Sequence, residues 1–235
     1  MNPVAVVPGA SRGIGREVAA GLAGDGYELA LVARGRADLE RLAAELPSDG
    51  GRAHSVTVLD VSDADAVDAA MGEILRRHGR VDVLFNNAGS YTAGGLDLSA
   101  EEFERMIKVN LVAPFLFMKA ALPAMKAQGA GHVFNVASRA GKVGFAGDGG
   151  YVASKFGLVG LSESIYREYA ETGIAVTAIC PGWTDTRMAW ESNTPLPAEE
   201  MIQPSDIVET VRWLLRLTPS VRIREIVLEC RRSIA

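Results

Sequence analysis

The chain has 235 residues, of which 48% are hydrophobic, 23% are charged and 6% are aromatic, and its formal net charge is −5. This is the composition of a globular protein with a sizeable core, and it excludes a disordered chain, a collagen and a small disulfide scaffold. A general nucleic-acid-binding protein normally carries a basic surplus, so the acidic balance argues against that class as well.

Short β-rich runs alternate with longer helical patterns along the whole chain. The predicted strands are residues 3–7, 28–33, 53–59, 81–85, 132–137, 174–180 and 224–229. The predicted helices are residues 13–23, 37–46, 63–78, 100–128, 151–172 and 204–217. Several strands are nearly continuous apolar runs, which are typical of strands covered on both faces. The alternation predicts a single doubly wound α/β domain of Rossmann type over residues 1–235, with a seven-stranded, mostly parallel sheet and helices on both faces.

The first predicted strand runs into the segment GASRGIG, residues 9–15, which opens the first helix. Glycines here allow a tight turn that brings backbone N–H groups and the helix N-terminus onto a pyrophosphate. The position after the first strand favours dinucleotide binding; a glycine-rich turn without a ligand is the alternative. The residues expected to bind the cofactor are Gly9, Ser11, Arg12, Gly13, Ile14 and Gly15.

The end of the second predicted strand indicates which dinucleotide binds. An NAD site usually carries an acidic residue there, which holds the ribose 2′-hydroxyl. This sequence has Arg34 and Arg36 instead, and Arg12 lies in the glycine loop. Arg12 and Arg34 could form a fork on a 2′-phosphate, which favours NADP(H) over NAD(H). The alternatives are that both arginines are solvated surface charges, or that NAD(H) is used.

Four further segments complete a pattern: Asp60-Val61, NNAG at residues 86–89, YVASK at 151–155 and PGWTDT at 181–186. With the glycine loop, they make the chain resemble the classical short-chain dehydrogenase/reductase family over nearly its whole length. The resemblance implies that Asp60 and Val61 meet the adenine. It also implies that the adenine ribose is lined by Asn87, Ala88 and Gly89. The residues that would flank the nicotinamide are Pro181, Gly182, Thr184 and Thr186.

The same resemblance implies a catalytic set of Asn110, Ser138, Tyr151 and Lys155. Tyr151 and Lys155 are four residues apart, which places them on one helix face, where both are also expected to contact the cofactor. A nearby ammonium should lower the pKa of the Tyr151 phenol, which then donates a proton to a carbonyl or accepts one from an alcohol. Ser138 would hydrogen-bond the substrate oxygen, and Asn110 would fix a water linked to Lys155. Taken singly, each residue has an ordinary structural reading; their combination favours catalysis.

The least regular stretch is residues 182–203, and we expect its part at about 183–203 to cover the substrate. Trp183, Met188, Trp190 and Met201, with Phe145 opposite, could line a substrate pocket or only pack the loop. Two departures from the family pattern are Pro8, which replaces a threonine and could weaken bracing of the glycine loop, and the C-terminus, which lacks a glycine pair. The glycines between Ser138 and Tyr151 could leave room for substrate or form a flexible loop.

The two cysteines, Cys180 and Cys230, form no CxxC pattern, which is typical of a reducing compartment. Cys180 is expected to be buried and Cys230 partly exposed. The longest apolar run, near residues 111–118, is too short to span a membrane, so we expect a cytoplasmic protein with no membrane partner. The three histidines have no ligand-like spacing, so no metal site is predicted.

These observations predict an oxidoreductase that transfers a hydride between NADP(H) and a small carbonyl or alcohol substrate. Within the family, the chain resembles NADPH-dependent ketoreductases such as 3-oxoacyl-[acyl-carrier-protein] reductase; sugar, steroid and xenobiotic reductases stay open. The alternatives are an NAD-dependent alcohol dehydrogenase of the same family and a non-catalytic dinucleotide-binding sensor. The resemblance also implies a homodimer or homotetramer that assembles through the two long helices.

Overall fold

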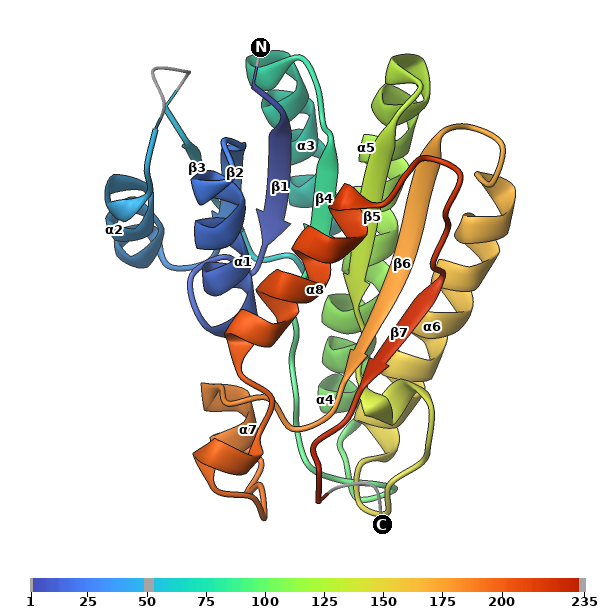
Figure 1. Ribbon diagram of the computed structural model, residues 1–235. Coiled ribbons are helices and arrows are strands. Elements are labelled where there is room, and N and C mark those ends of the chain that lie inside the picture. The colour runs from blue at the N-terminus through green and yellow to red at the C-terminus, as the bar shows by residue number, and fades with distance from the viewer. Residues whose placement is uncertain (1, 49–52, 233–235) are drawn as a thin grey trace.

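A computed structural model describes residues 2–48 and 53–232 of the chain (Figure 1). The strands in it are β1 (Val4–Pro8), β2 (Glu28–Ala33), β3 (Ser55–Val58), β4 (Val83–Asn86), β5 (Gly131–Val136), β6 (Ile174–Pro181) and β7 (Glu225–Leu228). They form one sheet in the order β3-β2-β1-β4-β5-β6-β7, and all neighbours are parallel. The predicted seven-stranded sheet is confirmed, and it is wholly parallel.

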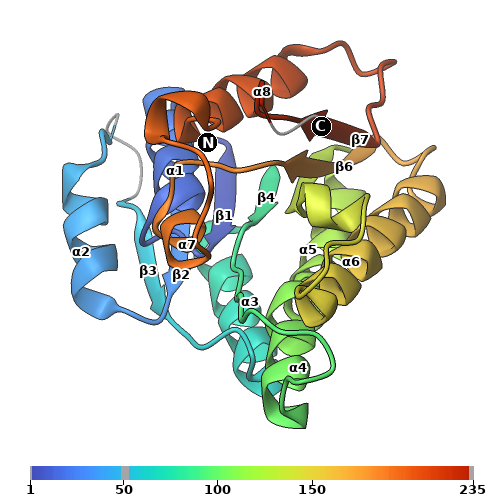
Figure 2. The ribbon, with the colours of Figure 1, turned by 90° about the horizontal axis from the view of Figure 1, so that it is seen from below.

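The helices lie on both faces of this sheet, as Figure 2 shows along the strands. They are α1 (Gly13–Gly24), α2 (Arg36–Glu45), α3 (Ala64–His78), α4 (Ala100–Ile107), α5 (Ala113–Gln128), α6 (Gly149–Glu168), α7 (Arg187–Glu191) and α8 (Pro204–Arg216). Helices α1 and α8 cover one face, and α3, α5 and α6 cover the other (Figures 1 and 2). The doubly wound arrangement predicted from the alternating pattern is therefore confirmed.

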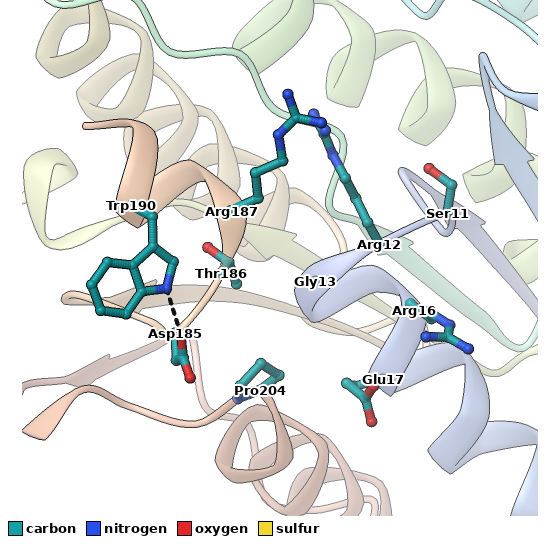
Figure 3. Close-up of a pocket in the computed structure, with 10 residues that line it drawn as sticks. All are labelled: Ser11, Arg12, Gly13, Arg16, Glu17, Asp185, Thr186, Arg187, Trp190 and Pro204. Carbon is teal, nitrogen blue, oxygen red and sulfur yellow. Dashed lines mark hydrogen bonds between the residues drawn. The ribbon is translucent and has the colours of Figure 1, made fainter. Parts of the chain in front are cut away.

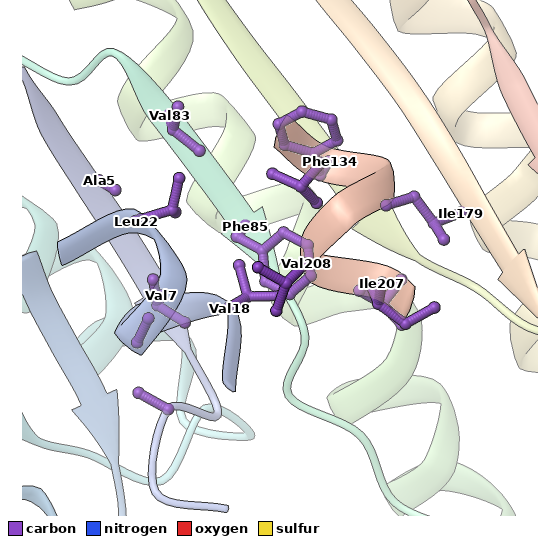
Figure 4. Packing of buried hydrophobic residues seen from close by; sticks show 14 of the residues in the cluster. Ala5, Val7, Val18, Leu22, Val83, Phe85, Phe134, Ile179, Ile207 and Val208 are labelled. Carbon is purple, nitrogen blue, oxygen red and sulfur yellow. The ribbon is translucent and has the colours of Figure 1, made fainter. Parts of the chain in front are cut away.

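The core consists of two main layers, one on each face of the sheet. Alternate residues of β1 divide between them: Ala5 and Val7 join the cluster beneath α1 and α8, and Val6 joins the opposite cluster. This follows from the two-residue period of a strand, and it explains why the strands read as continuous apolar runs. Figure 4 shows the first cluster, whose labelled members include Val18, Leu22, Phe85, Phe134, Ile207 and Val208.

The strand order reverses direction between β1 and β4, and the carboxyl ends of these strands therefore open a crevice at one edge of the sheet. All seven parallel strands end at this same edge, so the loops that follow them meet there. Segments far apart in the sequence, namely the glycine loop, the NNAG segment and the residues after β5 and β6, are thereby gathered into one place.

Two predicted elements differ in detail from the structure. The helix predicted over residues 100–128 is interrupted by a π-helical turn, Lys108–Val112, between α4 and α5. The stretch 182–203 contains α7 and a 3-10 turn, Ala198–Glu200. The segment Ala100–Gln128 is the one described helical stretch that is long and apolar enough to cross a membrane, and half of its apolar window is buried. Its Phe117, Met118 and Leu122 pack in the core, which is the environment of a core helix.

Candidate active site

The glycine loop joins the end of β1 to the start of α1. Gly9 has a φ of +80° and Gly13 a φ of +53°, the left-handed region that glycine adopts without strain. A Cβ on Gly15 would lie 2.9 Å from the carbonyl carbon of Gly9 and closer still to its oxygen, so only glycine permits this approach of helix and strand. The loop therefore has the tight turn and the exposed helix start that a pyrophosphate site requires.

The glycine loop is braced from two neighbouring segments. The N–H groups of Gly9 and Ala10 donate to the carbonyl oxygen of Val32 at 2.8 and 3.2 Å, and the Asn87 side-chain amide donates to the Gly9 carbonyl oxygen at 3.0 Å. Pro8 has no N–H group to donate, but these bonds do not involve it as a donor. The loop is thus held in place despite the departure at Pro8.

A cavity of about 360 Å³ opens at the start of α1 and faces α7 (Figure 3). Its lining consists of Ser11, Arg12, Gly13, Arg16, Glu17, Asp185, Thr186, Arg187, Trp190 and Pro204. A Cβ on Gly13 would lie 3.2 Å from Cγ2 of Thr186, so the glycine loop and the segment after β6 are close neighbours. Arg12 from the glycine loop and Arg187 from α7 both line this cavity (Figure 3). Cations beside a helix start fit the phosphates of a dinucleotide.

Arg34 lies at the end of β2, as the sequence predicts, and its side chain is 63% exposed. Its Nη1 is 4.0 Å from Oδ2 of Asp60, and Nη2 of Arg105 is 3.8 Å from the same oxygen. Hydrogen bonds from the backbone N–H and the hydroxyl of Ser62 help to hold the pKa of Asp60 below its usual value. Arg34 is therefore available at the surface for a 2′-phosphate, while its fork with Arg12 stays a prediction.

The NNAG segment follows β4 and lies directly against the glycine loop. A Cβ on Gly9 would come within 2.8 Å of the backbone of Ala88, and one on Gly89 would lie 3.7 Å from Oδ1 of Asn110. The same Cβ would be 3.6 Å from Cε of Met188 on α7. The structure thus places Asn87, Ala88 and Gly89 between the glycine loop, Asn110 and α7. Asp60 and Val61 follow β3 at the same edge of the sheet.

The segment after β6 is closed at its base. Thr184 pairs with Ile202 in an isolated parallel bridge, in which Asp185 N–H donates to the Ile202 carbonyl oxygen at 2.9 Å. Gly182 N–H donates to the carbonyl oxygen of Leu228 at 2.8 Å, which ties the segment to β7. Residues 182–203 therefore form a loop with a fixed base and with α7 at its tip, next to the glycine loop.

Tyr151 and Lys155 lie in the first two turns of α6, on one face of that helix. The Nζ of Lys155 lies 5.6 Å from the centre of the Tyr151 ring and donates to the carbonyl oxygen of Val136 at 2.8 Å. Ser138 follows β5 and hydrogen-bonds the Tyr151 side chain. The three side chains predicted for proton transfer are therefore brought together, and Lys155 is only 4% exposed.

Burial dominates the acidity of these groups. It raises the pKa of the Tyr151 phenol to about 12; the hydrogen bond with Ser138 opposes the rise, and the charge of Asp148 adds to it. Burial lowers the pKa of the Lys155 ammonium to about 8. The pKa of Tyr151 therefore lies above its usual value and not below it as predicted, because removing the phenolate from water is the largest contribution.

Asn110 lies in the π-helical turn between α4 and α5 and is fully buried. Its Oδ1 accepts from the N–H of Ser90 at 2.8 Å, and its Nδ2 donates to the carbonyl oxygen of Ser90 at 2.8 Å and to Oγ of Ser154 at 2.9 Å. The side chain thus connects the loop after β4 to α6, the helix that carries Tyr151 and Lys155. Its role in holding a water near Lys155 stays a prediction.

The bulky residues expected to form a pocket divide into two groups. Trp183 and Met201 pack against the core cluster beneath α1 and α8, so they are loop packing. Trp190 lines the cavity, is half-exposed and donates from Nε1 to Asp185 at 2.8 Å. Phe145 is partly exposed beneath the guanidinium of Arg139.

Both cysteines are buried, which is the prediction for Cys180. The expected exposure of Cys230 is wrong, because its Sγ donates to the carbonyl oxygen of Trp183 beneath the loop. Within the described ranges 2–48 and 53–232, no group of three or more His, Cys, Asp or Glu side chains could hold a metal ion.

Two residues of the site escaped the sequence prediction. Tyr91, in the loop after β4, donates from its hydroxyl to Oδ1 of Asp148 at 2.8 Å. Its ring meets the Tyr151 ring edge-on, with 5.3 Å between the centroids. The available signal was positional: Tyr91 lies two residues after the NNAG segment, and Asp148 lies three residues before Tyr151.

Known proteins resemble this chain in sequence and in structure. A family model described as short chain dehydrogenase matches residues 3–197. The 3-oxoacyl-[acyl-carrier-protein] reductase of Staphylococcus aureus is 36% identical over 224 residues, which cover 91% of each protein. The alcohol dehydrogenase of Thermococcus sibiricus, solved with 5-hydroxy-NADP, superposes with a TM-score of 0.87 at 38% identity and covers 96% of this chain and 95% of its own. A β-ketoacyl-[ACP] reductase of Bacteroides thetaiotaomicron gives a TM-score of 0.86 at 39% identity, with 100% and 99% covered.

Proposed function

The chain belongs to the short-chain dehydrogenase/reductase family, and from that membership we propose that it is an NADP(H)-dependent ketoreductase, which interconverts a carbonyl and an alcohol. The observation that carries this proposal is the partly buried Tyr151, hydrogen-bonded to Ser138 and one helical turn from the buried Lys155. A sensor that only binds a dinucleotide would have no use for a phenol presented in this way.

When bound, NADP(H) supplies or accepts the hydride, and the protein positions the partners and moves the proton. Ser138 donates a hydrogen bond to the substrate oxygen, which stabilises the charge that develops there. Tyr151 donates its hydroxyl proton to that oxygen during reduction. Because its pKa lies near 12, Tyr151 is a phenol at neutral pH and is ready to act as the acid. Lys155, held by Val136, adds positive charge that stabilises the phenolate left behind.

The arginines support NADP(H) as the cofactor. Arg34 is exposed at the end of β2, where a carboxylate would favour the ribose hydroxyl of NAD, and Arg12 stands at the start of α1. Guanidinium groups suit a 2′-phosphate because they offer several donors in one plane. The related alcohol dehydrogenase of Thermococcus sibiricus was solved with an NADP derivative, which agrees with this assignment.

For the substrate, we favour an apolar or extended carbonyl compound such as a 3-oxoacyl thioester. Phe145 and Trp190 are apolar side chains that stay partly exposed near the site, and such surface is best covered by an apolar ligand. Two of the relatives described above are named as reductases of 3-oxoacyl or β-ketoacyl carrier-protein substrates. NADPH oxidation measured with acyl thioesters, diketones, steroids and sugars would rank these classes directly.

The test of the catalytic assignment is Tyr151→Phe, which removes the transferable proton and keeps the ring. We expect kcat for carbonyl reduction to fall by at least about 100-fold, the size of a general-acid contribution, with NADPH affinity little changed. Unchanged turnover would refute the mechanism. An equal loss of NADPH binding and turnover would instead point to a disturbed fold, which circular dichroism would detect.

We also propose that the protein is a cytoplasmic homodimer or homotetramer. Phe103, Phe115 and Phe156 lie on α4, α5 and α6 and are 41%, 44% and 44% exposed. Three half-exposed phenylalanines on adjoining helices form an apolar face that a second copy would cover. Light scattering would give the oligomeric state, and Phe115→Lys should shift it toward the monomer.

A further inference from the structure

The loop after β4 and the start of α6 meet beside the catalytic tyrosine. The Tyr91 hydroxyl donates to Oδ1 of Asp148 at 2.8 Å, and the Tyr91 ring stands at 82° to the Tyr151 ring. The backbone also joins the two segments, because Gly94 N–H donates to the carbonyl oxygen of Gly147 at 2.6 Å. Tyr91 and Asp148 are therefore a fixed pair in contact with Tyr151, contributed by two separate elements.

Asp148 occupies the N-cap position of α6, yet its side chain makes no capping hydrogen bond. Aspartate is among the preferred N-cap residues because its carboxylate can accept from the first N–H groups of the helix. Here the carboxylate accepts the Tyr91 hydroxyl instead. A negative charge is thus held three residues before Tyr151 without serving the usual structural purpose of a cap.

The charged and polar groups around Tyr151 are the Asp148 carboxylate, the Tyr91 hydroxyl that donates to it, the Lys155 ammonium and the Ser138 hydroxyl. Burial, the hydrogen bond to Asp148 and the charges around it raise the pKa of Tyr91 to about 12, so Tyr91 stays a neutral donor. The one negative charge in this set is Asp148. It favours the protonated form of Tyr151 and opposes the effect of Lys155.

We propose that the Tyr91–Asp148 pair is a positioning element that keeps Tyr151 protonated, so that the site favours proton donation to a carbonyl over proton removal from an alcohol. The inference rests on the proposed ketoreductase function. In reduction, a hydride passes from NADPH to the carbonyl carbon, the Tyr151 O–H bond breaks as the alcohol O–H bond forms, and NADP⁺ leaves. The phenolate then regains a proton from solvent. In oxidation Tyr151 must first lose its proton, and a neighbouring carboxylate makes that loss harder.

The decisive variant is Asp148→Asn, which removes the charge but keeps the size, the capping preference and an oxygen that accepts from Tyr91. We would plot log kcat/KM for alcohol oxidation against pH from pH 7 to pH 10. The line for Asp148→Asn should be displaced to lower pH relative to that of the wild type. At a fixed pH we expect kcat/KM for oxidation to rise about two- to tenfold, because one pKa unit is a tenfold change in phenolate. Coincident lines for wild type and Asp148→Asn would overturn the proposal.

Two further variants separate charge from structure. Asp63→Asn is the matched control, because Asp63 caps α3 through Ala66 far along the chain from Tyr151, and it should leave the oxidation profile unchanged. Tyr91→Phe keeps the carboxylate and removes its partner, so turnover should fall in both directions without faster oxidation. If Tyr91→Phe accelerated oxidation as Asp148→Asn does, packing rather than charge would control Tyr151, and the proposal would be wrong.

A readout without turnover separates this inference from the proposed function. The ultraviolet phenolate signal of Tyr151 is the difference between titrations of a protein and its Tyr151→Phe counterpart. That difference titration should move to lower pH in the Asp148→Asn background. If it moves while no carbonyl compound is reduced, the electrostatic role of the pair is supported and the ketoreductase function fails. If turnover is normal and the titration does not move, the function stands and the pair has no such role.

Discussion

Gly15→Ala tests the close approach of α1 to the glycine loop. A Cβ at this position would lie 2.9 Å from the carbonyl carbon of Gly9 and would collide with its oxygen and with Nδ2 of Asn87. The neighbours are backbone and a side-chain amide engaged in a 3.0 Å hydrogen bond, so the collision cannot be relieved by rotating a free side chain. The loop must move, and the Asn87–Gly9 hydrogen bond must weaken.

The size of the effect follows from three opposing contributions. Overpacking costs about 1–3 kcal/mol, and the weakened hydrogen bond costs about 1 kcal/mol. Replacing glycine by alanine in a helix returns about 1 kcal/mol. The net loss of stability is about 1–3 kcal/mol, which for a chain of this size lowers Tm by roughly 2–12 °C. NADPH should bind more weakly because the displaced segment is the glycine loop, which we expect to bind the phosphates.

Gly72→Ala provides the matched control for this prediction. Gly72 lies inside α3, and a Cβ there would meet nothing within 4 Å. The same chemical change should therefore stabilise the protein by about 1 kcal/mol and leave NADPH binding intact. Thermal unfolding and fluorescence titration with NADPH measure both quantities. If Gly15→Ala raised Tm as Gly72→Ala does and bound NADPH normally, the close-approach reasoning would be refuted.

Two other substitutions test the cofactor site and the core. Arg34→Gln should raise the Kd for NADPH about tenfold, roughly the value of one charge-assisted contact, and leave the Kd for NADH unchanged. The control is Arg36→Gln, which breaks a surface ion pair with Glu40. Equal losses of affinity for NADPH and NADH in Arg34→Gln would contradict the assignment. His132 packs on Phe134, and burial with the nearby charge of Arg222 lowers its pKa from 6.5 to about 3. As pH falls, His132 becomes protonated in the unfolded chain at a higher pH than in the folded protein. Its contribution to the free energy of unfolding is therefore fully present above pH 6.5, and it falls by up to about 1.4 kcal/mol per pH unit as pH drops toward 3. His132→Asn should flatten that part of the curve of unfolding free energy against pH, and an unchanged slope would rule out His132 as its source.

The strands and the catalytic spacing were predictable because each depends on residues close together in sequence. Continuous apolar runs marked the buried strands, and the four-residue spacing of Tyr151 and Lys155 marked one face of a helix. The π-helical turn around Asn110 could not be predicted, because the apolar pattern of the helix continues through it without a break. Its cause lies in partners distant in sequence, Ser90 and Ser154, which hold the asparagine side chain.

The acidity of Tyr151 was mispredicted for a related reason. Its spacing to Lys155 is a local property, whereas the burial that raises its pKa comes from the packing of the whole site. The pair of Tyr91 and Asp148 likewise joins residues 57 positions apart, which no short motif relates. Sequence patterns brought the predicted catalytic residues to attention, but the environment that tunes them exists only after folding.

The wholly parallel sheet also divides the molecule into a reactive end and an inert end. At the amino ends of the strands, the chain turns through Gly26, Gly79 and Gly129, each with a positive φ and with open space where a side chain would stand. A tether, a fluorescent label or a fused protein could therefore be attached at these turns. The crevice at the opposite edge of the sheet would stay open to cofactor and substrate. The fold is thus suited to immobilisation in one defined orientation.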